Sequence, residues 1–208
     1  MRPQFGLLLF PEVEELDFVG PWEMLKMWER FLDGPACFTV AQHKQPIDCA
    51  NGLSVNPNYD FANCPPLDFL LVPGGPGTRR EVDNSVLVDF VRAQAAGCRV
   101  VLSVCTGSFV LHRAGLLAGR RATTHWGSLD RLRALGDVHV VEERNVVDGK
   151  LWSSAGVSAG IDMTLAFIAA QAGEEVAMKA QVAAEYFPDG RRYGRFADDP
   201  RAPAYLGR

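Results

Sequence analysis

Three short runs of mostly apolar residues limit the fold of this chain more than any other feature of its sequence. They are Phe5 to Phe10, LDFLLV (67–72) and RVVLSV (99–104), and each ends at a turn-forming segment. A strand buried on both faces of a parallel sheet has such an unbroken apolar pattern, whereas a half-exposed strand alternates. We therefore predict that these three segments are central parallel strands.

Segments with apolar residues at helical spacing accompany these strands. Ser85 to Ala96 lies between the second and third runs, and Gly97 after it is a typical helix end. Two more helices are predicted from Gly20 to Phe31, with Pro21 near the first turn, and from Ser158 to Ala170. Helices that alternate with buried strands predict an α/β fold, a mostly parallel sheet flanked by helices.

Two dipeptides typical of tight hairpin turns, Asn51-Gly52 and Asp148-Gly149, predict antiparallel ribbons at the edges of the sheet. The 208 residues, 48% of them hydrophobic, are enough for one sizeable core. We predict a single domain over residues 1–187. Residues 188–208 are rich in Arg, Asp, Gly and Pro and are predicted to form an irregular tail.

The charge pattern argues against a polyanionic partner. The formal net charge is -4 and no basic block is present, so nucleic acid and anionic membranes are not expected to bind. The first apolar run is too short for a secretory signal, and no stretch approaches the roughly 18 apolar residues of a membrane span. We expect a cytoplasmic protein whose partner is a small neutral organic molecule.

The cysteines do not form a structural framework. There are five, at positions 37, 49, 64, 98 and 105, an odd number without a C-x-x-C pair. Such a set predicts neither disulfides nor a zinc ribbon, and no pair of histidines has metal-ligand spacing. We predict free thiols, no metal and no cofactor.

One of these cysteines follows the third apolar run. Ser103-Val104-Cys105-Thr106-Gly107 has the pattern of a nucleophile elbow, in which a sharp strand-to-helix turn lifts the central side chain into a cleft. The positive end of the helix dipole and the unpaired amides would lower the pKa of the thiol. The alternative is that Cys105 is a small buried hydrophobe at the end of a strand.

Two glycines follow the second run. In α/β folds ligands bind beyond the carboxyl ends of the strands, so residues after the three runs are expected to share one crevice. Gly74 and Gly75 let backbone amides approach a reacting atom, and the Gly75 and Thr106 amides would together stabilise a developing anion. An ordinary turn explains the same two glycines.

Two further residues have a catalytic and a structural interpretation. Asp17, in EELDFVG, either caps the following helix or faces Cys105, where burial would raise its pKa and let it transfer a proton. His125, in RATTHWGS, either completes a triad with the thiol and an acid or only hydrogen-bonds at a strand end. The neighbouring glutamates are predicted to be solvated loop charges: Glu12, Glu14 and Glu15.

Four segments together resemble the ThiJ/PfpI superfamily: LLLFPEVEELDFVGPWEML, LDFLLVPGGPG, VVLSVCTGSFVLHRAGLLAGRRATTHW and SSAGVSAGIDMTLAFIA. The resemblance runs from Phe5 to about Phe187 and implies a flavodoxin-like fold similar to class I glutamine amidotransferases. Asp17, the diglycine, Cys105-Thr106-Gly107 and THW most resemble isocyanide hydratases. They also resemble the sensor domain of certain AraC-type regulators, but no helix-turn-helix region is expected after the short tail that ends at Arg208.

The resemblance implies a hydro-lyase that converts isocyanides to N-substituted formamides through a covalent thioimidate. It assigns Cys105 as the nucleophile, Asp17 as the proton carrier and Thr106 as the residue that orients the acid and the intermediate. Gly74 and Gly75 would line the pocket. Two alternatives remain: a glyoxalase-type carbonyl hydrolase, whose relatives mostly carry Glu where this chain has Asp17, and a non-enzymatic sensor in which Cys105 is oxidised.

The resemblance also implies a homodimer. Trp22, Met24 and Trp28 lie on the first long helix and would supply apolar surface for the interface. The alternative is that these three side chains face the sheet.

Overall fold

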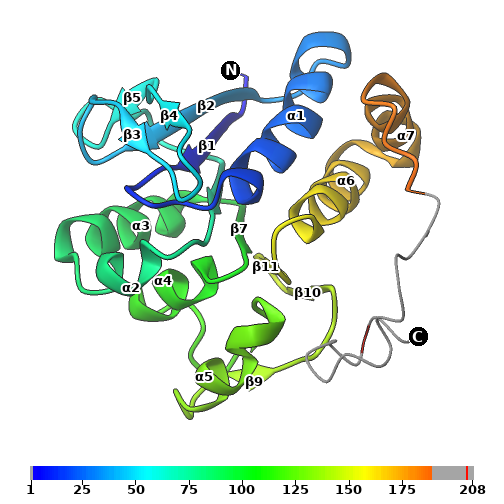
Figure 1. Ribbon diagram of the computed structural model, residues 1–208. Coiled ribbons are helices and arrows are strands. Elements are labelled where there is room, and N and C mark those ends of the chain that lie inside the picture. The colour runs from blue at the N-terminus through cyan, green and yellow to red at the C-terminus, as the bar shows by residue number, and fades with distance from the viewer. Residues whose placement is uncertain (1, 189–204, 206–208) are drawn as a thin grey trace.

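A seven-stranded sheet forms the centre of the molecule (Figure 1). The computed structural model describes residues 2–188 and Tyr205. The strand order is β10-β11-β7-β6-β1-β2-β5, and all neighbours are parallel except β10 and β11. The strands are β1 (Gln4–Leu8), β2 (Ala36–Ala41), β5 (Tyr59–Asp60), β6 (Phe69–Val72), β7 (Val100–Val104), β10 (Asn145–Asp148) and β11 (Leu151–Ser154).

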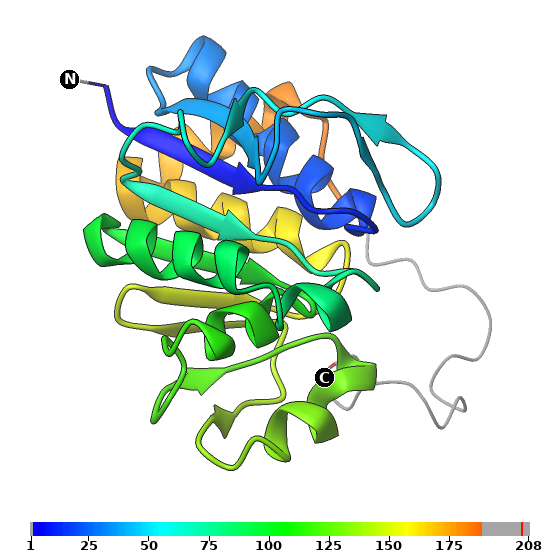
Figure 2. The ribbon, with the colours of Figure 1, turned by 90° about the vertical axis from the view of Figure 1, so that its left-hand side faces the viewer.

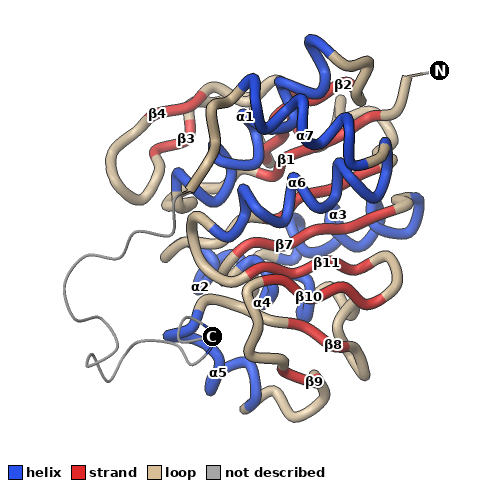
Figure 3. The backbone as a smooth tube through the Cα atoms, turned by 90° about the vertical axis from the view of Figure 1, so that its right-hand side faces the viewer, coloured by secondary structure: helices blue, strands red, loops and turns tan. Residues whose placement is uncertain are grey.

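Helices cover both faces of this sheet, as predicted for the α/β class. One face carries α1 (Glu15–Phe31), α6 (Ala159–Ala172) and α7 (Glu174–Ala183), which Figure 3 shows in front of the strands. The other face carries α2 (Thr78–Glu81), α3 (Ser85–Gly97) and α4 (Gly107–Arg113), visible in Figure 2. A small lobe beyond β10 contains β8 (Arg121–Ala122), the 3₁₀ turn η1 (Trp126–Ser128), α5 (Leu129–Arg133) and β9 (His139–Val140).

The three apolar runs are β1, β6 and β7, adjacent in the middle of the sheet, so this prediction is confirmed. Every residue of β6 and β7 is buried. The Phe167 ring of α6 packs edge-on against Phe5, Phe69 and Trp28, which ties the helical layer to the strands. Because β1, β6 and β7 run parallel, their carboxyl ends meet at one edge of the sheet.

Both predicted ribbons are present. Asn51-Gly52 lies between the antiparallel strands β3 (Ile47–Asp48) and β4 (Ser54–Val55). Asp148 pairs with Leu151 across the β10–β11 turn, where Gly149 has a φ of 61°, a conformation that suits glycine. Only the β10–β11 ribbon lies at an edge of the seven-stranded sheet, whereas β3 and β4 form a separate two-stranded sheet.

The first helix differs from its prediction. α1 begins at Glu15, five residues before Gly20, and Pro21 lies inside it. Gly20 is required there, because an added Cβ would lie 2.7 Å from Cγ1 of Ile161 on α6. The early start is possible because the first turn is buried against the ends of the strands rather than solvated, and it places Asp17 inside the helix.

The predicted dimer surface on α1 is also wrong. Met24 and Trp28 are buried against the sheet, and Trp22 is half-buried beneath the ammonium group of Lys26. These side chains therefore belong to the core or its margin.

Among the described residues, no helix is both long and apolar enough to cross a bilayer. The predicted tail, apart from Pro188 and Tyr205, lies outside the described residues.

Candidate active site

Cys105 occupies a sharp turn between β7 and α4. Its φ is 55°, a left-handed conformation that is uncommon outside glycine, and its amide donates to the carbonyls of Ser154 and Ala155 at 3.2 and 3.1 Å. The turn needs Gly107, because an added Cβ would lie 2.1 Å from the Val72 carbonyl oxygen. This is the geometry of a nucleophile elbow, and strain of this kind clusters at functional sites.

Asp17 lies against this turn and is fully buried. It does not cap its own helix. Instead, Oδ2 accepts a hydrogen bond from the Gly74 amide at 2.8 Å, and Oδ1 accepts one from the Val157 amide at 3.1 Å. Burial disfavours the charged form more than these bonds and the nearby thiol favour it, so the pKa of Asp17 rises from 3.8 to about 7. A carboxyl group with this pKa can both accept and donate a proton near neutral pH.

The Cys105 thiol has the opposite pKa shift from the one predicted. Burial is the largest cause and the charge of Asp17 the second, and together they raise the pKa of Cys105 far above its ordinary value of 9.0. The amide and the hydroxyl of Thr106 oppose this rise without overcoming it. The prediction from the helix dipole omitted burial, which dominates. The thiol is therefore protonated at neutral pH, and the Asp17 carboxyl group beside it is the one that ionises near pH 7.

The diglycine holds Asp17 and Thr106 in place. The Gly74 amide binds Asp17, and the Gly75 amide donates to Oγ1 of Thr106 at 3.0 Å. The Gly75 N–H is therefore already used in this structure and is not free to join the Thr106 amide in the predicted anion hole. An added Cβ on Gly74 would lie 2.5 Å from the Thr106 amide nitrogen and 2.8 Å from Oδ2 of Asp17. Gly74 therefore allows the acid and the elbow to come close together.

Thr78 is a site residue that the sequence did not reveal. It is buried, its Oγ1 donates to the Gly75 carbonyl at 2.7 Å, and the same oxygen lies 3.0 Å from Oγ1 of Thr106. Thr106 is thus held by Gly75 and Thr78. No hydrogen bond joins its hydroxyl to Asp17, so the amides of Gly74 and Val157 orient the acid instead.

His125 lines the same cavity as Cys105, which has a volume of about 200 Å³. Its Nδ1 accepts a hydrogen bond from the Gly127 amide at 3.1 Å, and burial lowers its pKa. In the described part of the chain, no carboxylate hydrogen-bonds to it. His125 therefore acts as a neutral wall of the cavity in this structure, not as the oriented base of a triad.

The acidic residues before Asp17 differ in their surroundings. Glu12 is exposed, as predicted, and Glu14 is half-buried at the cavity. Glu15 is buried and accepts hydrogen bonds from the amide and the side chain of Asn51, so its prediction as a solvated charge is wrong.

All five cysteines are free thiols. Within residues 2–188, no three His, Cys, Asp or Glu side chains form a cluster able to hold a metal ion.

Comparison with known sequences finds relatives over most of the chain. The model of the DJ-1/PfpI family matches residues 5–170. The isonitrile hydratase of Pseudomonas putida is 42% identical over 188 residues, which cover 90% of this chain and 80% of that enzyme. The HTH-type transcriptional regulator CdhR of Pseudomonas aeruginosa is 33% identical over 193 residues, 92% of this chain but only 56% of the regulator.

Solved structures share the fold. A ThiJ/PfpI family protein from Pseudomonas syringae superimposes with a TM-score of 0.84 at 34% identity, covering 91% of this chain and 77% of that one. DJ-1beta of Drosophila melanogaster has a TM-score of 0.77 at 19% identity, covering 89% of this chain and 98% of that one. At 19% identity, the likeness to DJ-1beta shows a shared fold alone.

Proposed function

The chain belongs to the DJ-1/PfpI family, and from this premise we propose that it is a hydro-lyase that converts isocyanides to N-substituted formamides. The observation that carries the proposal is the buried pair of Cys105 and Asp17, found in a chain 42% identical to an isonitrile hydratase. The substrate is a small organic molecule that enters the cavity above the elbow.

The first step joins the thiol to the terminal carbon of the isocyanide. Because the Cys105 thiol is protonated and Asp17 is partly ionised near pH 7, the carboxylate removes the thiol proton as sulfur attacks carbon. The same proton then passes from Asp17 to that carbon. The product is a thioimidate, in which carbon carries sulfur, hydrogen and a double bond to nitrogen, and Asp17 is again ionised.

The second step returns the enzyme to its starting state. Asp17 removes a proton from water, hydroxide adds to the thioimidate carbon, and the proton passes to nitrogen. When the C–S bond breaks, the hydroxyl proton returns by way of Asp17 to the departing sulfur. One water is consumed, the N-substituted formamide leaves, and no net redox change occurs.

The surrounding residues position these two groups. The amides of Gly74 and Val157 fix the carboxyl group of Asp17, and Thr78 with Gly75 fixes the Thr106 hydroxyl near the sulfur. Such preorganisation matters because misplacement by about 1 Å can cost on the order of a hundredfold in rate. Thr106 and the diglycine are thus positioning residues, and His125 limits the cavity.

Two alternative functions have less support. A glyoxalase-type carbonyl hydrolase would need the longer reach of a glutamate where Asp17 is already fixed by two amides. A sensor based on oxidation of Cys105 needs a readily ionised thiol, and burial keeps this one protonated. Free cysteines fit a reducing compartment, so we also place the protein in the cytoplasm.

The homodimer remains part of the proposal, on a different surface from the one predicted. Met178 and Val182 are exposed on α7, and Phe187 is exposed shortly after it. Met178 and Val182 are four residues apart and so share one face of the helix, and exposed apolar side chains on one face are typical of contact surfaces. Light scattering at micromolar concentration should give twice the mass of one chain, and a monomer would contradict the dimer.

An assay against two substrates tests the proposed activity. Purified protein is incubated with an aryl isocyanide and, separately, with methylglyoxal, and the products are identified by NMR. We expect formamide from the isocyanide and no lactate from methylglyoxal. Turnover of methylglyoxal alone would favour the carbonyl hydrolase, and turnover of neither would favour the sensor.

A further inference from the structure

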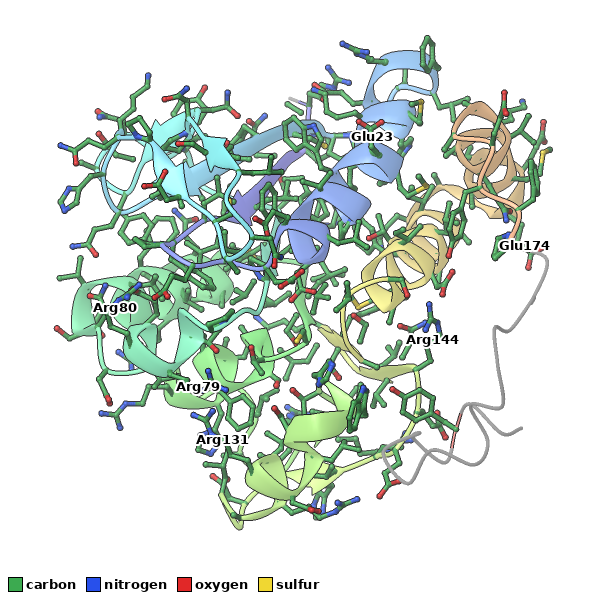
Figure 4. All side chains as sticks on the ribbon, viewed as in Figure 1. Glu23, Arg79, Arg80, Arg131, Arg144 and Glu174 are labelled. Atoms are coloured by element: carbon green, nitrogen blue, oxygen red, sulfur yellow. The ribbon has the colours of Figure 1, made fainter. Side chains whose placement is uncertain are left out.

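Two arginines from distant segments line the cavity that contains Cys105. Arg79 lies on α2 and Arg131 on α5, and Figure 4 shows both labelled side chains on the same side of the molecule. Because the two arginines are far apart in the sequence, they do not form a basic block in it. Only the fold brings the two positive charges to one cavity.

Neither guanidinium group is neutralised by a carboxylate in the described part of the chain. Their neighbours provide a contrast on the same two helices: Arg80 pairs with Glu12 and Glu81, and Arg133 pairs with Asp130 and Glu142. Arg79 and Arg131 make no such pair, although both are exposed. Of these four arginines, the two that line the cavity are therefore the ones without a carboxylate partner among the described residues.

Arg131 is held in place by packing. Its guanidinium carbon lies 4.4 Å from the centre of the Phe109 ring, and Phe109 is buried on α4, just after the elbow. Stacking over a ring leaves the N–H groups at the edge of the guanidinium plane available to a carboxylate. The packing thus fixes the position of a donor group without using its hydrogen-bonding capacity.

The remaining charges of the cavity wall offset only part of this pair. Glu14 is the only carboxylate among the described residues that line the cavity, Asp17 lies buried against Cys105, and His125 has a lowered pKa and stays neutral at pH 7. The pKa of Cys105 is governed by burial and by Asp17, so the arginines do not serve to ionise the thiol. They are available to the part of the substrate that does not react.

We propose that the substrate carries a carboxylate on the group attached to the isocyano nitrogen, and that Arg79 and Arg131 bind this carboxylate while the isocyano carbon meets Cys105. This proposal rests on the hydratase function. The isocyano group is neutral, but the substrate as a whole is then an anion, which differs from the neutral molecule expected from the sequence. Arginine suits this role because its fork of N–H donors matches the two oxygens of a carboxylate.

A pair of isosteric substrates tests the proposal: 4-isocyanobenzoate and 4-isocyanobenzamide, which differ in charge and hardly in shape. For the parent protein, we expect kcat/KM for the carboxylate to exceed that for the amide by about tenfold or more, mainly through KM. In Arg79→Met and Arg131→Met the ratio should fall severalfold, and in the double variant it should approach one. Addition of 0.5 M NaCl should also lower the parent's ratio.

Arg30→Met is the matched control, because Arg30 is an exposed arginine near the far end of α1 that makes no ion pair with a described residue. It should leave the ratio unchanged. Equal kcat/KM for both substrates in the parent, or a ratio that both pocket variants preserve, would overturn the anionic substrate while the hydratase function stands. If the parent hydrates neither compound, the proposed function fails and this inference fails with it.

Discussion

A hydrogen bond of 2.8 Å from the Gly74 amide to Oδ2 of Asp17 joins the first turn of α1 to the end of β6. It fixes the carboxyl group beside the elbow, and the Val157 amide holds the other oxygen. The acid therefore receives its orientation from two backbone segments far from it in the sequence. The position of this carboxyl group therefore depends on Gly74 as well as on the length of the Asp17 side chain.

Substitution of Asp17 separates a proton carrier from a structural carboxylate. Asp17→Asn keeps the shape of the side chain but removes proton transfer, so we expect kcat to fall at least about a hundredfold. Asp17→Glu should also impair turnover, because the added methylene displaces the carboxyl group from its two amides. Steady-state kinetics with one aryl isocyanide measure both effects. A value for Asp17→Asn within a factor of about two of the parent would mean that another group carries the proton.

The pH dependence of activity follows from the ionised form of Asp17. Its pKa is raised to about 7, and the base that accepts the thiol proton is the carboxylate. We expect kcat/KM to rise as the pH increases through about 7 and then to remain level, since the pKa of Cys105 lies far higher. A rate profile measured from pH 5 to pH 9 tests this. A fall in kcat/KM across neutral pH would show that protonated Asp17 is the active form.

The same pKa shift affects stability. The pKa of Asp17 rises from 3.8 to about 7 on folding, so between these values the unfolded chain releases its proton before the folded one does. The free energy of unfolding should therefore decrease with rising pH across this range, by up to about 4 kcal/mol from this group. Urea unfolding at several pH values should show this decrease in the parent and a smaller one in Asp17→Asn. Identical slopes would contradict the raised pKa.

Gly74→Ala tests the close approach of the acid to the elbow. Its Cβ would lie 2.5 Å from the Thr106 amide nitrogen, so the backbone has to move and carry Asp17 with it. We expect turnover to fall at least about tenfold, with a loss of stability of about 1–3 kcal/mol. Gly97→Ala is the control, because nothing lies within 4 Å of its Cβ position. Gly97→Ala should change neither turnover nor stability appreciably. If Gly74→Ala and Gly97→Ala had equal effects, Gly74 would have no special role in the site.

Much of the fold could be predicted from local patterns in the sequence. The central strands β1, β6 and β7 are unbroken apolar runs, and α3 and α6 show helical spacing with a cap or a glycine nearby. These patterns predict strands and helices correctly because each arises within one short segment whose apolar residues all face the same buried surroundings. The start of α1 was missed because its first turn contains acidic residues, which resemble a loop until burial against the strand ends is known.

The composition of the site was predicted better than its electrostatics. Cys105 and Asp17 lie next to each other, as the sequence analysis expected, but the predicted direction of the thiol pKa shift was wrong, because burial and the charge of Asp17 arise only when distant segments meet. Thr78 has no local signal, since a threonine in a glycine-proline loop is ordinary. Arg79 and Arg131 are likewise single charges in the sequence, and only the cavity shows that they act together.

The central claim is that Cys105 forms the covalent bond with the isocyanide, and intact-protein mass spectrometry after rapid acid quench tests it most directly. During turnover of an aryl isocyanide, the parent should gain the mass of one substrate, and peptide mapping should place it on Cys105. Cys105→Ala and Cys105→Ser should show neither adduct nor formamide while remaining folded, and Cys64→Ser, altered at a half-buried thiol, should behave as the parent. Most of the parental turnover in Cys105→Ala, or an adduct on another cysteine, would contradict the account.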